Sequence, residues 1–376
     1  MIQPPASCDL ESCNVYDNIL TEETAGLLKV YQNGIGIWMD IFDHTHTYQN
    51  EIVRCALSSP LLMYSICAMS AKQISLTQNK FLWEPIASRF YGESLSLLIT
   101  GLTDPSTERG LLLAATILLG SYELLAEPGT NYQRHIYGAS TVIQSFKTGE
   151  REMRLEQASI WVYARQDVAL ALLNERPTLT PPDKWPPLPK HADFVDERFG
   201  NEILQLLAKV IQIKFAQRSC VSPNTKHEDL QQLLWEIESL WGNLPSHFRG
   251  TRIKTVVDDP EGLSTLWFCD PAAGAACLYY HMSKILILEC LLEGAGEVEY
   301  TASIHSHARE ITSICLFSDL PDGAMVVAVN PVFYAAKHIP SLALKTRLWG
   351  VLDKIETRLG FYTRDRQTQL QRELQK

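Results

Sequence analysis

Hydrophobic residues recur at steps of three and four along much of this chain. The first such stripe lies within residues 27–42 and consists of Leu27, Leu28, Tyr31, Ile35, Trp38 and Phe42. Because an α-helix has about 3.6 residues per turn, this spacing places the apolar side chains on one face. The pattern therefore predicts an amphipathic helical segment that packs its stripe against a core.

Comparable patterns predict that most of the chain is helical. Ser59 and Pro60 supply an N-cap and a proline at the first helical position, which marks a helix start. Residues 107–126 are apolar on nearly every side, so we expect this helix at the centre of a bundle. The other expected helices cover about residues 83–98, 135–146, 155–173, 196–217, 227–241, 266–292, 303–317 and 342–359.

Residues 176–194 interrupt this periodicity. The segment RPTLTPPDKWPPLPKHADF contains six prolines, which exclude a regular helix and favour an extended or turn-rich chain. Trp185 and Leu188 within it indicate a segment that packs on the body of the protein, here called the proline-rich strap. No run of alternating β-branched residues predicts a strand, and residues 326–329 come nearest.

These patterns together predict an all-α fold. We expect a multi-helix bundle of about ten to twelve helices, with the proline-rich strap and no significant sheet. Residues 1–22 are expected to form a flexible N-terminal segment, followed by a helical domain over 23–376. A division of that domain into two lobes near residues 176–195 stays open.

Composition narrows the class of protein. The 376 residues are 46% hydrophobic and 20% charged, which suits a globular protein. The formal net charge is −10, which argues against a broad nucleic-acid-binding surface because such surfaces are basic. The nine cysteines are widely spread and odd in number, so we expect a reduced, intracellular protein without a disulfide framework. The uncharged runs 55–71 and 110–122 are shorter than the about 20 residues that span a bilayer, so no membrane contact is expected.

Several stretches, taken together and in order, resemble a known family. The more specific are a Gly-Ala pair at Gly138, the pattern Trp161-x-x-x-Arg165-Gln-Asp, and the Arg-Pro that follows at Arg176. Their companions are SPLLMYSICAMSAKQ from Ser59, LLLAATILLGSYELL from Leu111, HIYGASTVI from His135, SIWVYARQDVALALLNERPTL from Ser159 and NPVFYAAKHIPSLALKTRLWGVLDKIETRLG from Asn330. From about residue 27 to 374 the chain is similar to the fungal-specific transcription factor domain, the helical regulatory region of zinc binuclear cluster regulators.

The resemblance implies a nuclear regulatory protein that acts through protein partners, a homodimer or a metabolite. The chain departs from the family pattern at its start. The zinc cluster needs six cysteines, some closely spaced and interleaved with basic residues. Here Cys8 and Cys13 are followed by no third cysteine before Cys55, and no basic residue precedes Lys29. We therefore expect this chain to lack its own DNA-binding head and to make no direct contact with nucleic acid.

Two short motifs could carry chemistry. In Asp40-Ile-Phe-Asp43-His44-Thr-His46, a continuing helix would bring Asp40 toward Asp43 and His44, which suits proton transfer. The alternative is a helix end with a histidine near its last turn. We favour this alternative, because short motifs often match by chance.

The second motif is His305-Ser-His307-Ala-Arg-Glu310. His307 and Glu310 share a helix face and could supply two metal ligands, but a third is not evident, so a solvated ion-pairing face is favoured and no metal is expected.

Aromatic residues provide the candidates for ligand binding. Trp161 lies four residues before Arg165, so the guanidinium could stack on the indole or hold the strap, with a ligand-lining role second. The candidate ligand-binding residues are Trp38, Trp161, Tyr279, Tyr280 and His281. For the last three, a place in the core is the common outcome at helical spacing.

Two functional hypotheses follow. The first is a transcription-factor-type regulatory protein that responds to partners or to a small apolar metabolite. The alternative is a family scaffold recruited in the cytoplasm as a cofactor-independent cyclase or isomerase of secondary metabolism, with Asp40, His44 and Arg165 as catalytic candidates. Nucleophile-elbow, zinc-protease, phosphate-loop and dinucleotide motifs are missing, so no cofactor is expected. A third interpretation is a fragment of a longer regulator.

Overall fold

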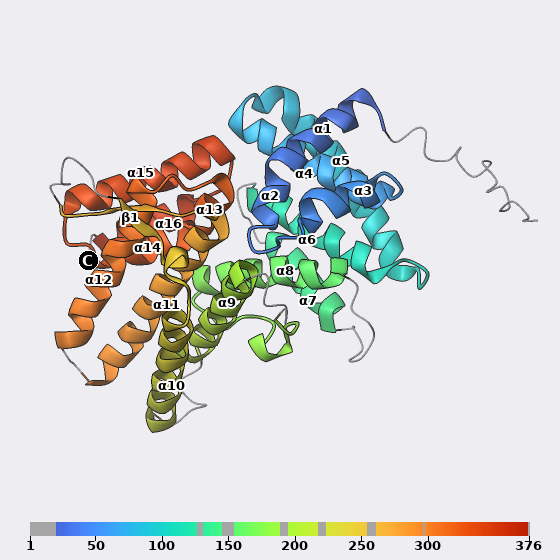
Figure 1. Ribbon diagram of the computed structural model, residues 1–376. Helices are drawn as coiled ribbons and strands as arrows, with labels where there is room; N and C mark the ends of the chain where they lie inside the picture. The colour runs from blue at the N-terminus through green and yellow to red at the C-terminus, as the bar shows by residue number, and fades with distance from the viewer. Residues whose placement is uncertain are drawn as a thin grey trace, which may run out of the picture.

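The computed structural model describes residues 20–125, 131–144, 154–188, 195–216, 223–253, 261–295 and 298–374. Helices dominate these residues, and the all-α prediction is confirmed (Figure 1). The first half of the chain forms α1 Glu22–Asn33, α2 Ile35–Met39, α3 Ile52–Ala56, α4 Pro60–Thr77, α5 Lys80–Thr103, α6 Arg109–Leu125, α7 Asn131–Gln144 and α8 Arg154–Leu173. The second half forms α9 Val195–Lys214, α10 Pro223–Gly242, α11 Pro271–Ala295, α12 Val298–Phe317, α13 Asp322–Val327, α14 Val329–His338, α15 Leu342–Leu359 and α16 Arg364–Leu374.

The helix boundaries follow from local chemistry. Ser59 caps α4 by accepting a hydrogen bond from the Leu62 amide, and Pro60 is its first residue, as predicted. The stripe from Leu27 to Phe42 is buried as expected, but the chain turns at Gly34 and divides the segment into α1 and α2. Short helices of this kind make the helices more numerous than the ten to twelve expected.

The two halves of the chain lie beside each other in Figure 1, with the blue-to-green helices α1–α8 on one side and α9–α16 on the other. Buried side chains continue from one group of helices to the other as one hydrophobic core. The division into two lobes near residues 176–195 stays a prediction. So does the flexible N-terminal segment, because residues 1–19 lie outside the described part of the chain.

Helix α11 is the most apolar element of the second half. Residues Pro271–Leu292 are long and apolar enough to cross a membrane by length and composition, and 89% of that apolar window is buried inside the protein. A helix that is hydrophobic on all sides and surrounded by other helices is typical of a protein core. Helices α9 and α12 both pack against α11.

Three local expectations needed correction. The helix expected over 266–292 begins only at Pro271, because Leu266 belongs to a short strand. That strand, β2 Thr265–Trp267, pairs in antiparallel register with β1 Thr251–Ile253. Residues 326–329 do not form a strand, in agreement with the sequence pattern, and span the end of α13 and the start of α14. The helices α13, α14 and α16 do not appear among the helices predicted from periodicity.

The proline-rich strap packs on the body of the protein over its described residues. It is non-helical except for a 3₁₀ turn at Pro182–Lys184. Trp185 is buried, and its ring meets Trp161 edge-on with 5.9 Å between ring centroids. The carboxylate of Asp167 accepts hydrogen bonds from the amides of Leu179 and Thr180, at 2.9 and 3.0 Å. The strap is therefore fixed to α8 by an aromatic contact and a carboxylate.

Candidate functional site

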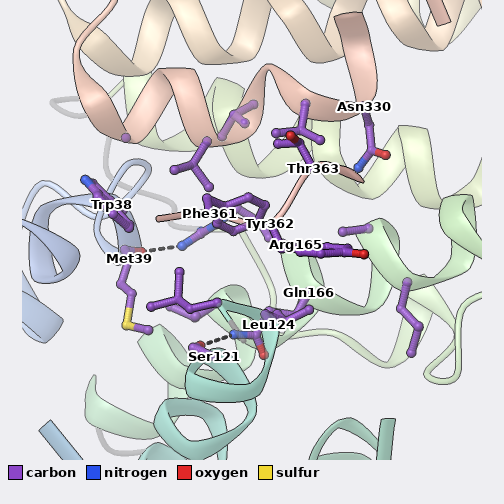
Figure 2. A pocket seen from close by; sticks show the side chains of 18 of the residues that line it. Trp38, Met39, Ser121, Leu124, Arg165, Gln166, Asn330, Phe361, Tyr362 and Thr363 are labelled. Atoms are coloured by element: carbon purple, nitrogen blue, oxygen red, sulfur yellow. Dashed lines mark hydrogen bonds between the residues drawn. The ribbon is translucent and has the colours of Figure 1, made fainter. Parts of the chain in front are cut away.

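A cavity of about 180 Å³ lies where α2, α6 and α8 of the first half meet α11, α13 and α14 of the second (Figure 2). Most of its lining is apolar and includes Ile35, Trp38, Leu124, Val162, Leu170 and Val326. Its polar lining includes Ser121, Arg165, Gln166, Asn330 and Thr363. An apolar hollow with a few convergent polar groups is the usual form of a small-molecule site.

Arg165 introduces a positive charge into this cavity. It lies on α8, and one of its Nη2 hydrogens is donated to the Met39 carbonyl at the end of α2 (Figure 2). Its guanidinium also lies 5.8 Å from the centroid of the Phe42 ring. Burial lowers the pKa of Arg165, although Tyr279 and Asp40 act in the opposite direction. Arg165 therefore connects the two sides of the cavity wall and does not stack on Trp161, whose ring packs on Trp185 of the strap.

The side-chain amide of Gln166 adds a buried oxygen, Oε1, that lacks a hydrogen-bond partner among the described residues. Its Nε2 donates to Ser121 Oγ at 2.6 Å (Figure 2), and Ser121 Oγ in turn donates to the Ile117 carbonyl at 2.8 Å. Because the serine proton is already used, the amide orientation is fixed with its nitrogen toward Ser121. Gln166 Oε1 is buried and has no hydrogen-bond donor among the described residues, which is costly for an acceptor unless another group supplies one.

The segment between α15 and α16 closes one side of the cavity. Phe361, Tyr362 and Thr363 line it, as Figure 2 shows. This segment is held by Arg366 on α16, whose Nη2 and Nε donate to Asn330 Oδ1 at 2.6 and 3.0 Å. The C-terminal part of the chain thus contributes directly to the same cavity as α2.

Asp40 lies behind the cavity wall and is not part of a proton-transfer pair. Helix α2 ends at Met39, so the continuing helix expected for this motif does not form. The Asp40 carboxylate accepts hydrogen bonds from the amides of Tyr48 and Gln49 at 2.9 and 2.7 Å. Burial raises the pKa of Asp40 to about 7, helped by the nearby charge of Asp43 and opposed by the hydrogen bonds from these amides.

His44 and Asp43 complete the same loop. His44 is exposed to solvent, whereas Asp40 is buried. Burial acts to raise the pKa of Asp43, but hydrogen bonds from Thr45 and Thr47 outweigh it and lower that pKa. Asp40 and Asp43 therefore organise the backbone of the loop that follows α2, and His44 lies beyond the last turn of that helix.

A second hollow, here called the histidine cleft, contains two of the other ligand-binding candidates. Tyr280 and His281 line it together with Trp241, Arg249, Arg252, His307 and Glu310, and it has a volume of about 340 Å³. The Nδ1 atoms of His281 and His307 lie 2.9 Å apart. Because a ring nitrogen can either donate or accept, such a contact needs one ring that donates from Nδ1 and a neutral partner ring that accepts at Nδ1.

Charge is unfavourable for both histidines of the cleft. Burial lowers the pKa of His281 well below its ordinary value, and the neighbouring His307 adds to the effect. Burial and Lys284 lower the pKa of His307 to about 4. His307 and Glu310 do share the cleft, but Glu310 pairs with Arg252 at 2.5 Å. Among the described residues, no three His, Cys, Asp or Glu side chains gather as ligands for a metal ion.

The structure separates residues that the sequence grouped. Trp38, Arg165 and Tyr279 line the cavity, whereas Tyr280 and His281 line the cleft. Trp161 holds the strap instead of lining either hollow. Sequence reasoning missed Gln166, although it stands inside the Arg-Gln-Asp motif. It also missed Asn330 and the segment Phe361–Thr363, whose aromatic residues between two helices carry no periodic signal.

Comparison with known proteins gives the same family as the sequence motifs. The fungal-specific transcription factor domain matches residues 26–371. The chain is 22% identical to the transcription activator AMTR1 of Alternaria alternata over 94% of its own length, and it spans 64% of that relative. No solved structure matches the chain. Because the family match covers nearly the whole sequence, this chain belongs to the family of fungal-specific transcription factor domains.

Proposed function

We propose that this chain regulates transcription in the nucleus and that a small apolar effector controls it by occupying the cavity. Family membership supports the regulatory role, and the relative named as a transcription activator supports activation as its direction. The cavity carries the effector proposal, because it is largely apolar and lies between the two groups of helices.

The position of the cavity provides a route from ligand to regulation. Its walls come from α2 near the start of the described chain, from α8 and α11 in the middle, and from residues 361–366 near its end. A ligand shifts a conformational equilibrium only by binding one arrangement better than another. A molecule that touches all these elements favours the arrangement of helices that surrounds it. We propose that partner proteins recognise this ligand-bound arrangement.

The size of the cavity limits the effector. A cavity of about 150 Å³ lined by apolar side chains can hold one benzene ring. The cavity here, at about 180 Å³, suits a molecule of one ring or one short chain, roughly ten non-hydrogen atoms. The unpartnered Gln166 Oε1 adds support, because a bound molecule with a hydrogen-bond donor satisfies it.

The enzyme hypothesis has less support from this geometry. Of its three catalytic candidates, only Arg165 lines the cavity. The Asp40 carboxylate is bound to two amides, and His44 faces solvent. Protein partners, a homodimer and the missing DNA-binding head stay predictions, and Cys8 and Cys13 lie outside the described residues.

Binding can be tested with a cavity-filling variant. Ala169 lies on α8 and lines the cavity, so Ala169→Phe places a ring in the space while Ala169→Ser leaves it open. Titration calorimetry and thermal unfolding with one-ring and short-chain compounds should show binding, and a raised Tm, for the wild type and Ala169→Ser. Absence of binding to the wild type across these compounds contradicts the effector proposal.

The regulatory consequence needs a cellular measurement. The whole chain, tethered to an unrelated DNA-binding domain in a fungal host, should raise expression of a reporter gene more strongly in the presence of a compound that binds it. Ala169→Phe should remove the response to the compound, and Ala169→Ser should retain it. Equal reporter activity with and without a bound compound shows that the cavity does not regulate transcription.

A further inference from the structure

We infer that the effector is an apolar monocarboxylate, whose carboxylate pairs with Arg165 while its body fills the apolar part of the cavity. This inference rests on the proposed function, since it names the chemical class of the molecule that binds there. It comes from the charge inside the cavity and from the partners that the charged groups have.

Arg165 is a half-buried cation without a carboxylate partner among the described residues. Its guanidinium donates a hydrogen bond to the neutral Met39 carbonyl, and its aromatic neighbour is Phe42. Among the described residues, no carboxylate oxygen lies within 4.0 Å of its guanidinium. A guanidinium offers five donors in a planar fork that matches a carboxylate, so much of its hydrogen-bonding capacity is left for a ligand.

Asp40 is an acidic group whose charge acts on Arg165, but it does not take this role. Both of its oxygens accept backbone hydrogen bonds, from Tyr48 and Gln49. Its pKa of about 7, raised chiefly by burial, means that a substantial fraction is neutral at physiological pH. A carboxylate firmly paired with a buried guanidinium would have a lowered pKa instead.

The remaining charges of the cavity do not cancel Arg165 either. The lining contains a second guanidinium, on Arg366, and one carboxylate, on Asp365. Arg366 donates to Asn330 and to Gln369 Oε1, and Asp365 accepts from the Tyr362 hydroxyl at 3.3 Å. The lining thus holds two guanidinium groups and one carboxylate, and that carboxylate is not within 4.0 Å of Arg165.

The expected complex satisfies both features of the cavity. A carboxylate forms charge-assisted hydrogen bonds with the guanidinium fork. The apolar lining accommodates a hydrocarbon body of one ring or a short chain. An amide of nearly the same shape makes the apolar contacts but leaves the guanidinium without an anionic partner.

A matched pair of probes tests this on the wild-type protein. Titration calorimetry at pH 7.5 compares 3-phenylpropionate with 3-phenylpropanamide, which has the same shape and no charge. We expect the acid to bind at least about 10-fold more tightly than the amide. Octanoate and octanamide repeat the comparison with a flexible body.

Variants then locate the charge that makes the difference. Arg165→Gln should bring the acid-to-amide affinity ratio to about 1, and Arg165→Lys, which keeps the charge but not the fork, should retain part of it. Arg198→Gln is the control, because Arg198 is an exposed arginine of α9 that pairs with Glu202 away from the cavity. Circular dichroism verifies that each variant is folded. The acid-to-amide comparison on the wild-type protein remains valid even if a variant does not fold.

The outcomes separate this inference from the proposed function. An amide that binds as tightly as the acid, with binding lost in Ala169→Phe, overturns the monocarboxylate inference and leaves the effector cavity intact. Acid binding that persists in Ala169→Phe and disappears in Arg249→Gln places the carboxylate in the histidine cleft and overturns the inference. Binding of neither probe pair to the wild type overturns both proposals.

Discussion

The cavity at Arg165 and the histidine cleft place their charged groups in different surroundings. In the cavity, the guanidinium of Arg165 faces a largely apolar space, and Asp40, which does not line that space, is bound to backbone amides. In the cleft, Glu310 pairs with the exposed Arg252, the two histidines are held neutral, and Arg249 donates to the backbone carbonyls of Gly242 and Leu244. Both hollows therefore contain a guanidinium with no carboxylate partner among the described residues, but only the cavity surrounds it with a mainly apolar lining.

This difference indicates which hollow is prepared for a ligand. A guanidinium beside an apolar space suits a molecule with an anionic end and a hydrocarbon body. The cleft suits such a body less well, because its lining holds more charged and polar groups. The comparison can be tested through pH, through packing and through the ion pair itself.

The largest expected effect is the pH dependence that Asp40 confers. Its pKa is about 7 in the folded chain against an ordinary value of 3.8. A raised carboxyl pKa contributes stability that is fully present below about pH 4 and is lost as the pH rises through 7. The free energy of unfolding of the wild type relative to Asp40→Asn should fall by about 4 kcal/mol over this range. Urea denaturation at several pH values measures it, and a difference that stays constant with pH contradicts the burial of this charge.

The histidine cleft should behave with the opposite sign. The pKa of His307 is about 4 in the folded chain against 6.5 ordinarily. A lowered histidine pKa contributes stability that is present above pH 6.5 and is lost as the pH falls through 4. The wild type should therefore lose about 3 kcal/mol relative to His307→Gln between pH 7 and pH 4.

The same urea titrations provide the check on the cleft. His305→Gln, on the same helix but outside the histidine pair, controls for the introduction of glutamine. Because the Asp40 and His307 effects oppose each other between pH 4 and 7, the wild type alone conceals both, and only the variants separate them. A His307→Gln profile parallel to that of the wild type would show that the pair is not buried in solution.

The contrast between cavity and cleft also shows where sequence reasoning stops. Tyr279, Tyr280 and His281 follow one another on one helix, and the sequence pattern makes all three candidates for the same ligand site. Successive residues of a helix point about 100° apart, so Tyr279 faces the cavity while the next two face the cleft. Periodicity predicts that this helix is buried. It cannot predict which residues lie against each of its faces, because those neighbours depend on tertiary packing.

Arg165 illustrates the same limit for a single contact. Its spacing from Trp161 suggested a local pair, which is a reasonable expectation for residues four apart on a helix. In the structure its hydrogen-bond partner is Met39, which is 126 positions away in the sequence. The residues of α8 that hold the strap, Trp161 and Asp167, could be guessed from the motif, because the strap follows the helix directly. The cavity required contacts between segments that no local pattern connects.

Packing beside the cavity should be less tolerant than packing beside the cleft. A methyl group on Gly200 of α9 would lie 2.2 Å from Cδ1 of Phe42, the ring next to Arg165. Gly200→Ala must displace that ring and should lower the free energy of unfolding by about 3 kcal/mol. Gly242, the last residue of α10 near the cleft, has open space around it. Gly242→Ala should leave stability unchanged or raise it by less than about 1 kcal/mol.

A second substitution shows whether the glycine effect comes from Phe42. In Gly200→Ala with Phe42→Leu, the smaller side chain makes room for the new methyl group, so the two changes should cost less together than the sum of the single changes. Thermal and urea unfolding of the three variants give this coupling. Additive costs indicate that the strain of Gly200→Ala lies elsewhere in the wall.

The smallest expected effect concerns the ion pair of the cleft. Arg252 and Glu310 lie 2.5 Å apart, with side chains 57% and 27% exposed. Water and salt screen a pair of this kind, so Glu310→Gln should change the free energy of unfolding by less than about 1 kcal/mol, and by less still in high salt. In the cavity, by contrast, the carboxylate of the effector is expected to determine binding to Arg165. If Glu310→Gln costs more than about 2 kcal/mol, the charges of the cleft are as strongly desolvated as those of the cavity, and the cleft becomes an equal candidate for the ligand site.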